Sequence, residues 1–120
     1  MSLNTLEEIA NYIVSDGKGI LAADESNPTC GKRFDSIGVE STETNRRDYR
    51  EMLFRASGMQ DNIGGVILFD ETIRQSAKDG TPLVELIKNQ GALPGIKVDQ
   101  GLAALESSPY ETVTQGLEGL

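Results

Sequence analysis

The chain has 120 residues, a length that suits one globular domain. Its formal net charge of −8, from 11 basic and 19 acidic residues, argues against nucleic acids and anionic membranes as partners. One cysteine and no histidine exclude an internal disulfide and a Cys/His metal cluster, which fits a reducing compartment. No apolar run is long enough to span a bilayer, and the acidic N-terminus is unlike a signal or transit peptide.

Residues 1–14 are predicted to form a packing helix. Thr5 and Glu8 have the spacing of a capping box, in which each side chain accepts a hydrogen bond from a free N–H group of the first turn. Apolar residues follow at helical spacing, and the polar stretch 15–17 should end the helix.

The stretch 17–26 then predicts a strand over residues 19–24 that ends in two acids. Its continuous apolar run is typical of a strand in a parallel sheet, with both faces buried. Asp24 would lie at the carboxyl end of this strand, where α/β barrels and open α/β sheets carry their catalytic groups. The alternative is that Asp24 only caps the segment that follows.

Residues 26–38 are predicted to be a loop, because serine, asparagine, proline, threonine and glycine are frequent in this stretch. The loop contains Lys32 and Arg33, and an arginine together with hydroxyl and N–H groups could hold a phosphate. Spacing alone favours a plain solvated loop, because the stretch has neither a P-loop nor a dinucleotide-binding glycine pattern.

A second long helix is predicted from a cap at Ser41 or Thr42 to about Ala56, with Glu51 and Arg55 as an ion pair one turn apart. The helix should end before a Ser-Gly pair. Its apolar face is expected to contain Tyr49, Met52, Leu53 and Ala56.

Two further strands are predicted over residues 64–69 and 93–99, and the helix between them would be opened by a cap at Thr81 and a proline at the first helical position. The last strand contains Lys97. A charge inside an apolar strand is costly unless it is paired or reaches a polar cavity, so Lys97 is a candidate site residue. Exposure at a sheet edge is the alternative for Lys97.

Helices and strands thus alternate, which predicts an α/β fold with a three-stranded parallel sheet. Asp24, Asp70 and Asp99 each end a strand, so they are expected on one polar rim. Residues 100–112 are predicted to be loop, and residues 114–120 to begin a helix. A helix that stops in its first turn suggests that the chain is the N-terminal part of a larger α/β protein.

The motifs that carry a family resemblance run through nearly the whole chain in order. They are 17–26 (GKGILAADES), 32–33 (KR), 36–38 (SIG), 42–46 (TETNR), 64–69 (GGVILF), 95–99 (GIKVD) and 114–120 (TQGLEGL). With these motifs the sequence closely resembles the N-terminal third of the class I fructose-bisphosphate aldolases, the Schiff-base type that needs no metal. The resemblance is to their plant and bacterial branch more than to the animal one.

The resemblance implies a (β/α)8 TIM barrel, of which this chain supplies the first three βα units, incomplete in itself, as the N-terminal part of a single domain. It implies the reversible cleavage of fructose 1,6-bisphosphate to dihydroxyacetone phosphate and glyceraldehyde 3-phosphate in glycolysis and gluconeogenesis. A lysine Schiff base would serve as the electron sink. The parent protein would be a cytoplasmic lyase and a homotetramer, without metal or organic cofactor.

The resemblance also implies roles for single residues. Asp24 would interact with the C4 hydroxyl that is deprotonated during cleavage, and Lys97 would contribute positive charge beside the substrate, so both are candidate catalytic residues. The candidate ligands of the sugar's C6 phosphate are Ser26, Thr29 and Arg33. Glu25 and Asp99 match motif positions and are expected to have structural or supporting roles.

By the same resemblance, the Schiff-base lysine and the C1-phosphate site would lie beyond Leu120, so the 120-residue chain alone is expected to be inactive. One alternative is another Schiff-base or phosphate-handling barrel enzyme. The other is a short, non-catalytic protein that binds a partner through bare sheet edges or exposed apolar helix faces.

Overall fold

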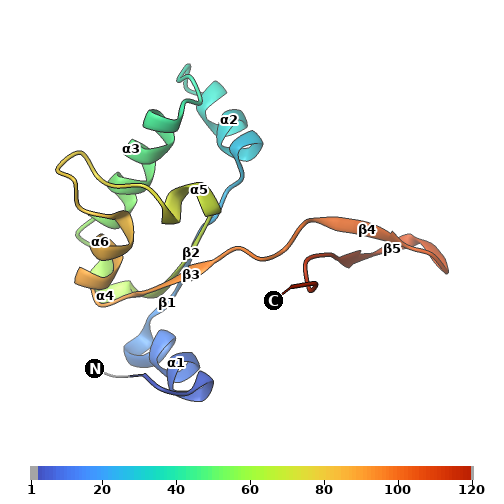
Figure 1. Ribbon diagram of the computed structural model, residues 1–120, viewed down its shortest axis with the longest axis horizontal. Helices are drawn as coiled ribbons and strands as arrows, with labels where there is room; N and C mark the ends of the chain where they lie inside the picture. The colour runs from blue at the N-terminus through green and yellow to red at the C-terminus, as the bar shows by residue number, and fades with distance from the viewer. Residues whose placement is uncertain (1–2, 120) are drawn as a thin grey trace.

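The structure, a computed structural model, describes residues 3–119. Helical segments lie between the first three strands, and two further strands follow at the C-terminal end (Figure 1). In chain order the elements are α1 (Leu6–Ile13), the 3-10 helix η1 (Ser15–Gly17), β1 (Gly19–Ala23), α2 (Asn27–Asp35), α3 (Glu43–Phe54), α4 (Met59–Asn62), β2 (Ile63–Leu68), α5 (Asp70–Ile73), α6 (Leu83–Asn89), β3 (Leu93–Ile96), β4 (Leu102–Leu105) and β5 (Ser108–Thr114). No helix within residues 3–119 is long and apolar enough to cross a membrane.

Strands β1, β2 and β3 form one parallel sheet with β2 in the middle, which confirms the predicted α/β fold. Ala23 of β1 lies opposite Leu68 of β2, and Leu68 lies opposite Ile96 of β3. All three strands therefore end at the same level, and the residues that follow them meet at one edge of the sheet.

Helices α3 and α6 cover one face of this sheet. Phe54 of α3 and Ile87 of α6 pack in one core with Val66 and Leu68 of β2, and all four side chains are at most 2% exposed. The other face is open, and Ile20 of β1 is 54% exposed. The expectation that the strands would be buried on both faces is wrong for the described residues, because the connections through α3 and α6 both return on the same face.

Helix α1 crosses the amino end of the sheet. Its predicted capping box is confirmed: the Glu8 N–H donates to Thr5 Oγ1 at 3.1 Å, and the Thr5 N–H donates to Glu8 Oε2 at 2.9 Å. At its other end the helix lies so close to β2 that a Cβ atom at Gly64 would be only 2.0 Å from the carbonyl oxygen of Ile13. The predicted residues 1–2 of this helix lie outside the described part.

Residues 26–38, predicted to be a loop, instead contain helix α2. A proline stands in the first turn, where its missing N–H group has no cost, and Cys30 and Phe34 are both buried one turn apart. These are helix signals that the polar composition of the stretch obscured. The correction matters for the site, because helix α2 carries two of the three candidate phosphate ligands, Thr29 and Arg33, and begins directly after the third, Ser26.

Strands β4 and β5 form an antiparallel hairpin that projects from the rest of the chain (Figure 1). The predictions of a loop over residues 100–112 and of a helix beginning at Thr114 are therefore wrong for the described residues. The stretch 108–114 contains Tyr110, Thr112, Val113 and Thr114, residue types that are frequent in strands. Gly116 then has a φ of 121°, which a helix does not allow, and Leu120 lies outside the described residues.

Helix α3 begins after its predicted cap, Thr42, and the ion pair one turn apart, Arg55 to Glu51, is present at 3.0 Å. Its buried side differs from the predicted one, because Met52 is 61% exposed. The buried residues of α3 are Arg46, Arg50 and Phe54. Two of these three are arginines, so the helix packs through charged side chains that need partners.

Candidate active site

Asp24 and Lys97 come together at the carboxyl edge of the sheet. Asp24 directly follows β1 and Lys97 directly follows β3, and Lys97 Nζ lies 3.7 Å from Asp24 Oδ2. Their preceding residues, Ala23 and Ile96, pair at the same level with β2, so alternation turns both charged side chains toward the open face. About three quarters of each side chain is buried, with 26% of Lys97 and 25% of Asp24 exposed.

The ammonium group of Lys97 also binds Asp99, whose Oδ1 lies 2.5 Å from Lys97 Nζ. This hydrogen bond and the negative charges of Asp99 and Asp24 raise the pKa of Lys97. The same bond lowers the pKa of Asp99. Lys97 is thus held as a cation between two carboxylates, which suits electrostatic stabilisation and opposes nucleophilic attack, because attack needs the neutral amine.

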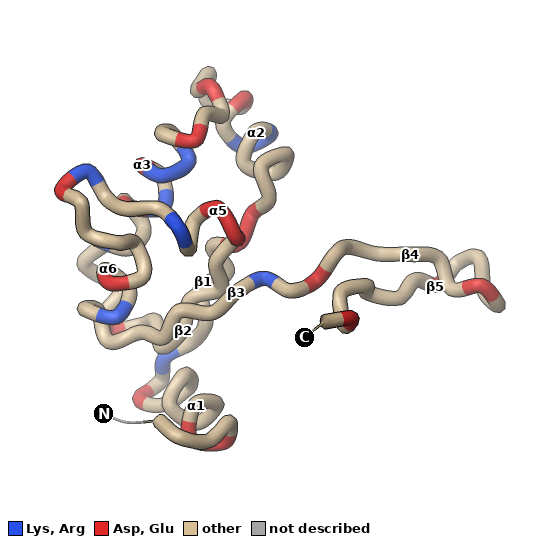
Figure 2. The backbone as a smooth tube through the Cα atoms, viewed as in Figure 1, with Lys and Arg blue, Asp and Glu red and all other residues tan. Residues whose placement is uncertain are grey.

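The predicted rim of three acids contains only two of them. Asp70 is the first residue of α5 and pairs at 2.9 Å with Arg74, the residue that caps the end of that helix. Both of these side chains are largely exposed. The prediction is therefore wrong for Asp70, because a helix begins immediately after β2 and supplies its own arginine. Figure 2 shows these acidic positions of α5, and further along the chain the basic and acidic positions that follow β3.

The three candidate phosphate ligands lie on one side of α2. Ser26 caps the helix, and its Oγ lies 3.2 Å from Oγ1 of Thr29 in the first turn. Arg33 is one turn after Thr29, and 60% of its side chain is exposed. The structure thus places a hydroxyl pair at the first turn of α2 and the guanidinium-bearing Arg33 in its last turn, on the same side of the helix. The N-terminal end of a helix favours anions, because its free N–H groups and dipole are positive.

Glu25 connects α2 with α3. It is only 8% exposed, and its Oε2 accepts hydrogen bonds from Arg33 Nη1 at 2.5 Å and from the Tyr49 hydroxyl at 2.8 Å. The backbone oxygen of Glu25 accepts a hydrogen bond from Arg50 Nη2 at 2.8 Å. Sequence reasoning did not find Tyr49 or Arg50 as neighbours of the site. Asp24 and Glu25 are consecutive, yet Asp24 contacts Lys97 on the open face, whereas Glu25 contacts α2 and α3.

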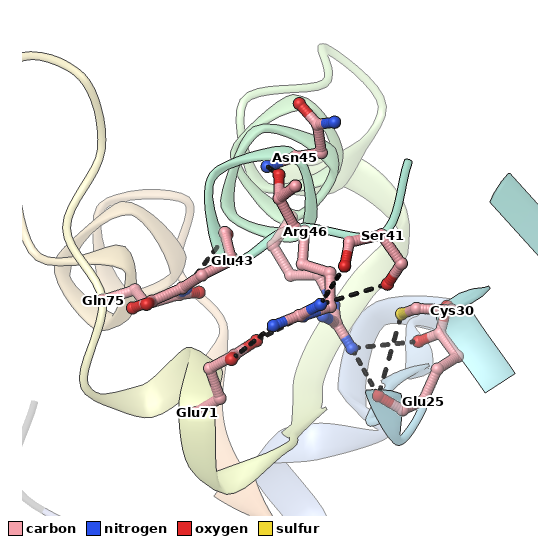
Figure 3. Close-up of polar contacts among 10 residues, drawn as sticks. Glu25, Cys30, Ser41, Glu43, Asn45, Arg46, Glu71 and Gln75 are labelled. Atoms are coloured by element: carbon pink, nitrogen blue, oxygen red, sulfur yellow. Dashed lines mark hydrogen bonds and ion pairs between the residues drawn. The ribbon is translucent and has the colours of Figure 1, made fainter. Parts of the chain in front are cut away.

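A second buried ion pair joins α3 to α5 beside this region (Figure 3). Arg46 donates from Nε to Glu71 Oε1 at 2.7 Å and from Nη2 to Glu71 Oε2 at 2.9 Å, and its Nη1 donates to the Ser41 backbone oxygen at 2.9 Å. The hydrogen bonds from Arg46 lower the pKa of Glu71. This geometry is the two-pronged arrangement in which arginine binds carboxylate most strongly, so it fixes α3 relative to the end of β2.

An open polar cavity of about 400 Å³ lies away from these residues. Its lining residues are Glu43, Thr44, Arg47, Arg74, Gln75 and Ser76. Both of its arginines already have carboxylate partners, Asp48 and Asp70, so the cavity offers little charge to a ligand. Within residues 3–119 no group of three or more Cys, Asp or Glu side chains could hold a metal ion. The Asp24–Lys97 cluster therefore remains the candidate site.

Comparisons of the sequence with family models and with known proteins match one family. A family model described as glycolytic fructose-bisphosphate aldolase class I matches residues 5–120. A probable fructose-bisphosphate aldolase class 1 of Xanthomonas campestris is 52% identical over 120 residues, which are 100% of this chain and 36% of the relative. The cytosolic fructose-bisphosphate aldolase 6 of Arabidopsis thaliana is 56% identical over 116 residues, or 95% of this chain and 32% of the relative.

Among solved structures, the fructose-bisphosphate aldolase of Plasmodium falciparum, in complex with TRAP and a small molecule inhibitor, superposes with a TM-score of 0.86 at 49% identity. The match covers 92% of this chain and 32% of that one. The chain thus spans about a third of the length of the relatives and of the solved structure that it matches.

Proposed function

Because the chain belongs to the class I fructose-bisphosphate aldolase family, we propose that the full-length protein cleaves fructose 1,6-bisphosphate reversibly to dihydroxyacetone phosphate and glyceraldehyde 3-phosphate. The predicted fold is confirmed: the three parallel strands are part of a (β/α)8 barrel. Residues 1–120 would be the N-terminal part of that single domain. Family membership removes the alternative of a different Schiff-base barrel.

The observation that carries this proposal is the contact between Asp24 and Lys97 at the carboxyl edge of the sheet. A lysine outside residues 1–120 would form an iminium with the substrate ketone and release water. The Asp24 carboxylate would then accept the proton of the C4 hydroxyl while the C3–C4 electron pair moves into the iminium, which becomes an enamine as the aldehyde leaves. Lys97, held as a cation, would stabilise negative charge close to this proton transfer.

The proposed binding site for the C6 phosphate consists of Ser26, Thr29 and Arg33. Three features support it: the positive end of α2, two hydroxyls 3.2 Å apart, and a guanidinium that is mostly exposed. Glu25 and Asp99 would support the site, since each forms a short hydrogen bond to one of its cations, Arg33 and Lys97 respectively.

We further propose a cytoplasmic homotetramer that acts in glycolysis and gluconeogenesis and binds neither nucleic acid nor membrane. The Arabidopsis relative named as cytosolic supports the location, and the net charge of −8 disfavours polyanionic partners. The tetramer rests on the family resemblance, and its mass in solution would test it.

Borohydride trapping tests the catalytic proposal. The full-length protein is incubated with dihydroxyacetone phosphate, reduced, digested and analysed by mass spectrometry. The expected result is one adduct per chain, on a lysine outside residues 1–120. An adduct on Lys97 would assign the nucleophile to this chain, and the absence of any adduct would contradict Schiff-base chemistry altogether.

A further inference from the structure

Tyr49 and Arg33 bind the same carboxylate oxygen. The Tyr49 hydroxyl donates to Glu25 Oε2 at 2.8 Å, and Arg33 Nη1 donates to that same atom at 2.5 Å. Tyr49 lies on α3 and Arg33 on α2, so the shared carboxylate is the point where the two helices meet. Tyr49 has no role in the site proposed so far.

The position of Glu25 is fixed from several directions. Its side chain is 6% exposed, and its backbone oxygen accepts a hydrogen bond from the fully buried Arg50. The Arg50 guanidinium also lies 3.8 Å from Glu25 Oε1. One carboxylate therefore lies close to two guanidiniums, those of Arg33 and Arg50.

We infer that Tyr49 and Glu25 are positioning residues that hold the Arg33 guanidinium ready for the C6 phosphate of the substrate. The inference rests on the phosphate role proposed above for Arg33. An exposed arginine is flexible and loses side-chain entropy when it binds an anion. The hydrogen bond from Arg33 Nη1 to Glu25 uses one of the five N–H donors of the guanidinium, and the other donors stay free for the phosphate. Because this bond already restricts the Arg33 side chain, less side-chain entropy is lost when the phosphate binds.

A substitution can remove the hydroxyl of Tyr49 and keep the packing of its ring. The ring packs edge-on against Phe34 with centroids 5.7 Å apart, and it lies 5.6 Å from the guanidinium carbon of Arg50. A phenylalanine keeps both contacts and removes only the hydrogen bond to Glu25. Changing Glu25 itself would leave Arg50 buried without its carboxylate and would endanger the fold, so Tyr49→Phe is the sharper variant.

The experiment compares Tyr49→Phe, Arg33→Ala and the double variant in the full-length protein, with fructose 1,6-bisphosphate and fructose 1-phosphate as substrates. Tyr12→Phe is the matched control, because it removes a hydroxyl that donates at 2.6 Å to the Gly91 backbone oxygen, at the opposite end of the sheet. We expect Tyr49→Phe to raise KM for the bisphosphate about three- to tenfold, at unchanged kcat, with no effect on the monophosphate. In the Arg33→Ala background it should have no further effect.

Two results would overturn this inference while leaving the role of Arg33 intact. In the first, Arg33→Ala is selective for the bisphosphate but Tyr49→Phe leaves both KM values unchanged, as Tyr12→Phe does. In the second, the effects of Tyr49→Phe and Arg33→Ala on KM multiply in the double variant, which shows that Tyr49 acts independently. If Arg33→Ala affects both substrates equally, the phosphate role of Arg33 is wrong and the inference falls with it.

Discussion

Asp24 and Lys97 contact each other across the central strand, with 3.7 Å between Oδ2 and Nζ, although they follow the first and the third strand of the sheet. The contact is a consequence of register, because β1, β2 and β3 end at the same level and residues at one level share a face. Neither side chain is needed to fill the core, so their chemistry can be altered without unfolding the sheet.

Asp24→Asn should lower kcat of the full-length protein by about 10²- to 10⁴-fold, because the amide cannot accept the hydroxyl proton. Thermal unfolding should change little, since Asp24 lies on the open face. Asp70→Asn is the matched control: Asp70 also follows a strand, but it pairs with Arg74 away from the cluster and should leave kcat unchanged. A kcat loss that came with an equal loss of folded protein would contradict the catalytic role of Asp24.

Asp99→Asn should lower the pKa of Lys97, because the hydrogen bond from Lys97 to Asp99 is the largest cause of its elevation. The raised pKa means that the protonated state contributes stability below the ordinary lysine pKa, about 10.4, and that this contribution is lost as pH rises through the folded value. Titration of the Lys97 Cε resonance by NMR measures the shift directly. An unchanged titration midpoint in Asp99→Asn would assign the elevation to Asp24 instead.

Glu71→Ala should reduce the free energy of unfolding by about 3 kcal/mol, because Arg46 would remain buried without its carboxylate. The Arg46 side chain is 10% exposed and that of Glu71 is 20% exposed, so solvent screens this pair only weakly. Asp70→Ala removes an exposed pair in the same helix and should cost little by comparison. Urea unfolding of both variants checks the difference, and equal costs would show that burial does not set the strength of these pairs.

The Arg46–Glu71 pair also predicts how stability depends on pH. The pKa of Glu71 is lowered in the folded state, so its contribution is complete above the ordinary glutamate pKa, about 4.3, and is lost as pH falls through the folded value. In Glu71→Gln the free energy of unfolding should therefore decline less steeply below about pH 5. Parallel acid limbs for the two proteins would show that Glu71 titrates normally.

Gly64→Ala should destabilise the protein by about 1–3 kcal/mol or displace α1, because the new Cβ would overlap the backbone of Ile13. Gly19→Ala is the control, since a Cβ at Gly19 in β1 meets nothing within 4 Å. The free energies of unfolding from urea denaturation, with the helical circular dichroism of both variants, test the prediction. Equal stability would mean that the amino end of the sheet tolerates a shifted helix.

The sequence was a good guide where a single period or cap decides the structure. The capping box of Thr5 and Glu8, the apolar runs of the parallel strands and the cap at Thr42 all have local physical causes. Helix α2 was missed because its composition is polar, and only the spacing of Cys30 and Phe34 marks it. The β4–β5 hairpin was missed because β4 is an apolar run of only four residues and β5 is mostly polar.

Some residues of the candidate site were also found from the sequence, and others were missed. Asp24 was expected at the end of a predicted strand and Lys97 within another, and the family resemblance assigned both to one site. Nothing local marks Arg46 and Arg50 as buried, because their carboxylate partners, Glu71 and Glu25, are separated from them by 25 residues each. Whether a charged side chain can be buried depends on its partner, which here is distant in the sequence. The spacing of apolar residues along one helix therefore does not reveal it.

Asp24 and Glu25 are adjacent in the chain but contact different parts of the structure. One side chain faces the open side of the sheet beside Lys97, and the next is held under α2 and α3 by Arg33, Tyr49 and Arg50. Helix α3 contacts neither Asp24 nor Lys97, but its residues Tyr49 and Arg50 hold Glu25, the residue next to Asp24. An engineer who wanted to adjust substrate affinity without changing Asp24 or Lys97 would therefore start from the buried side of α3.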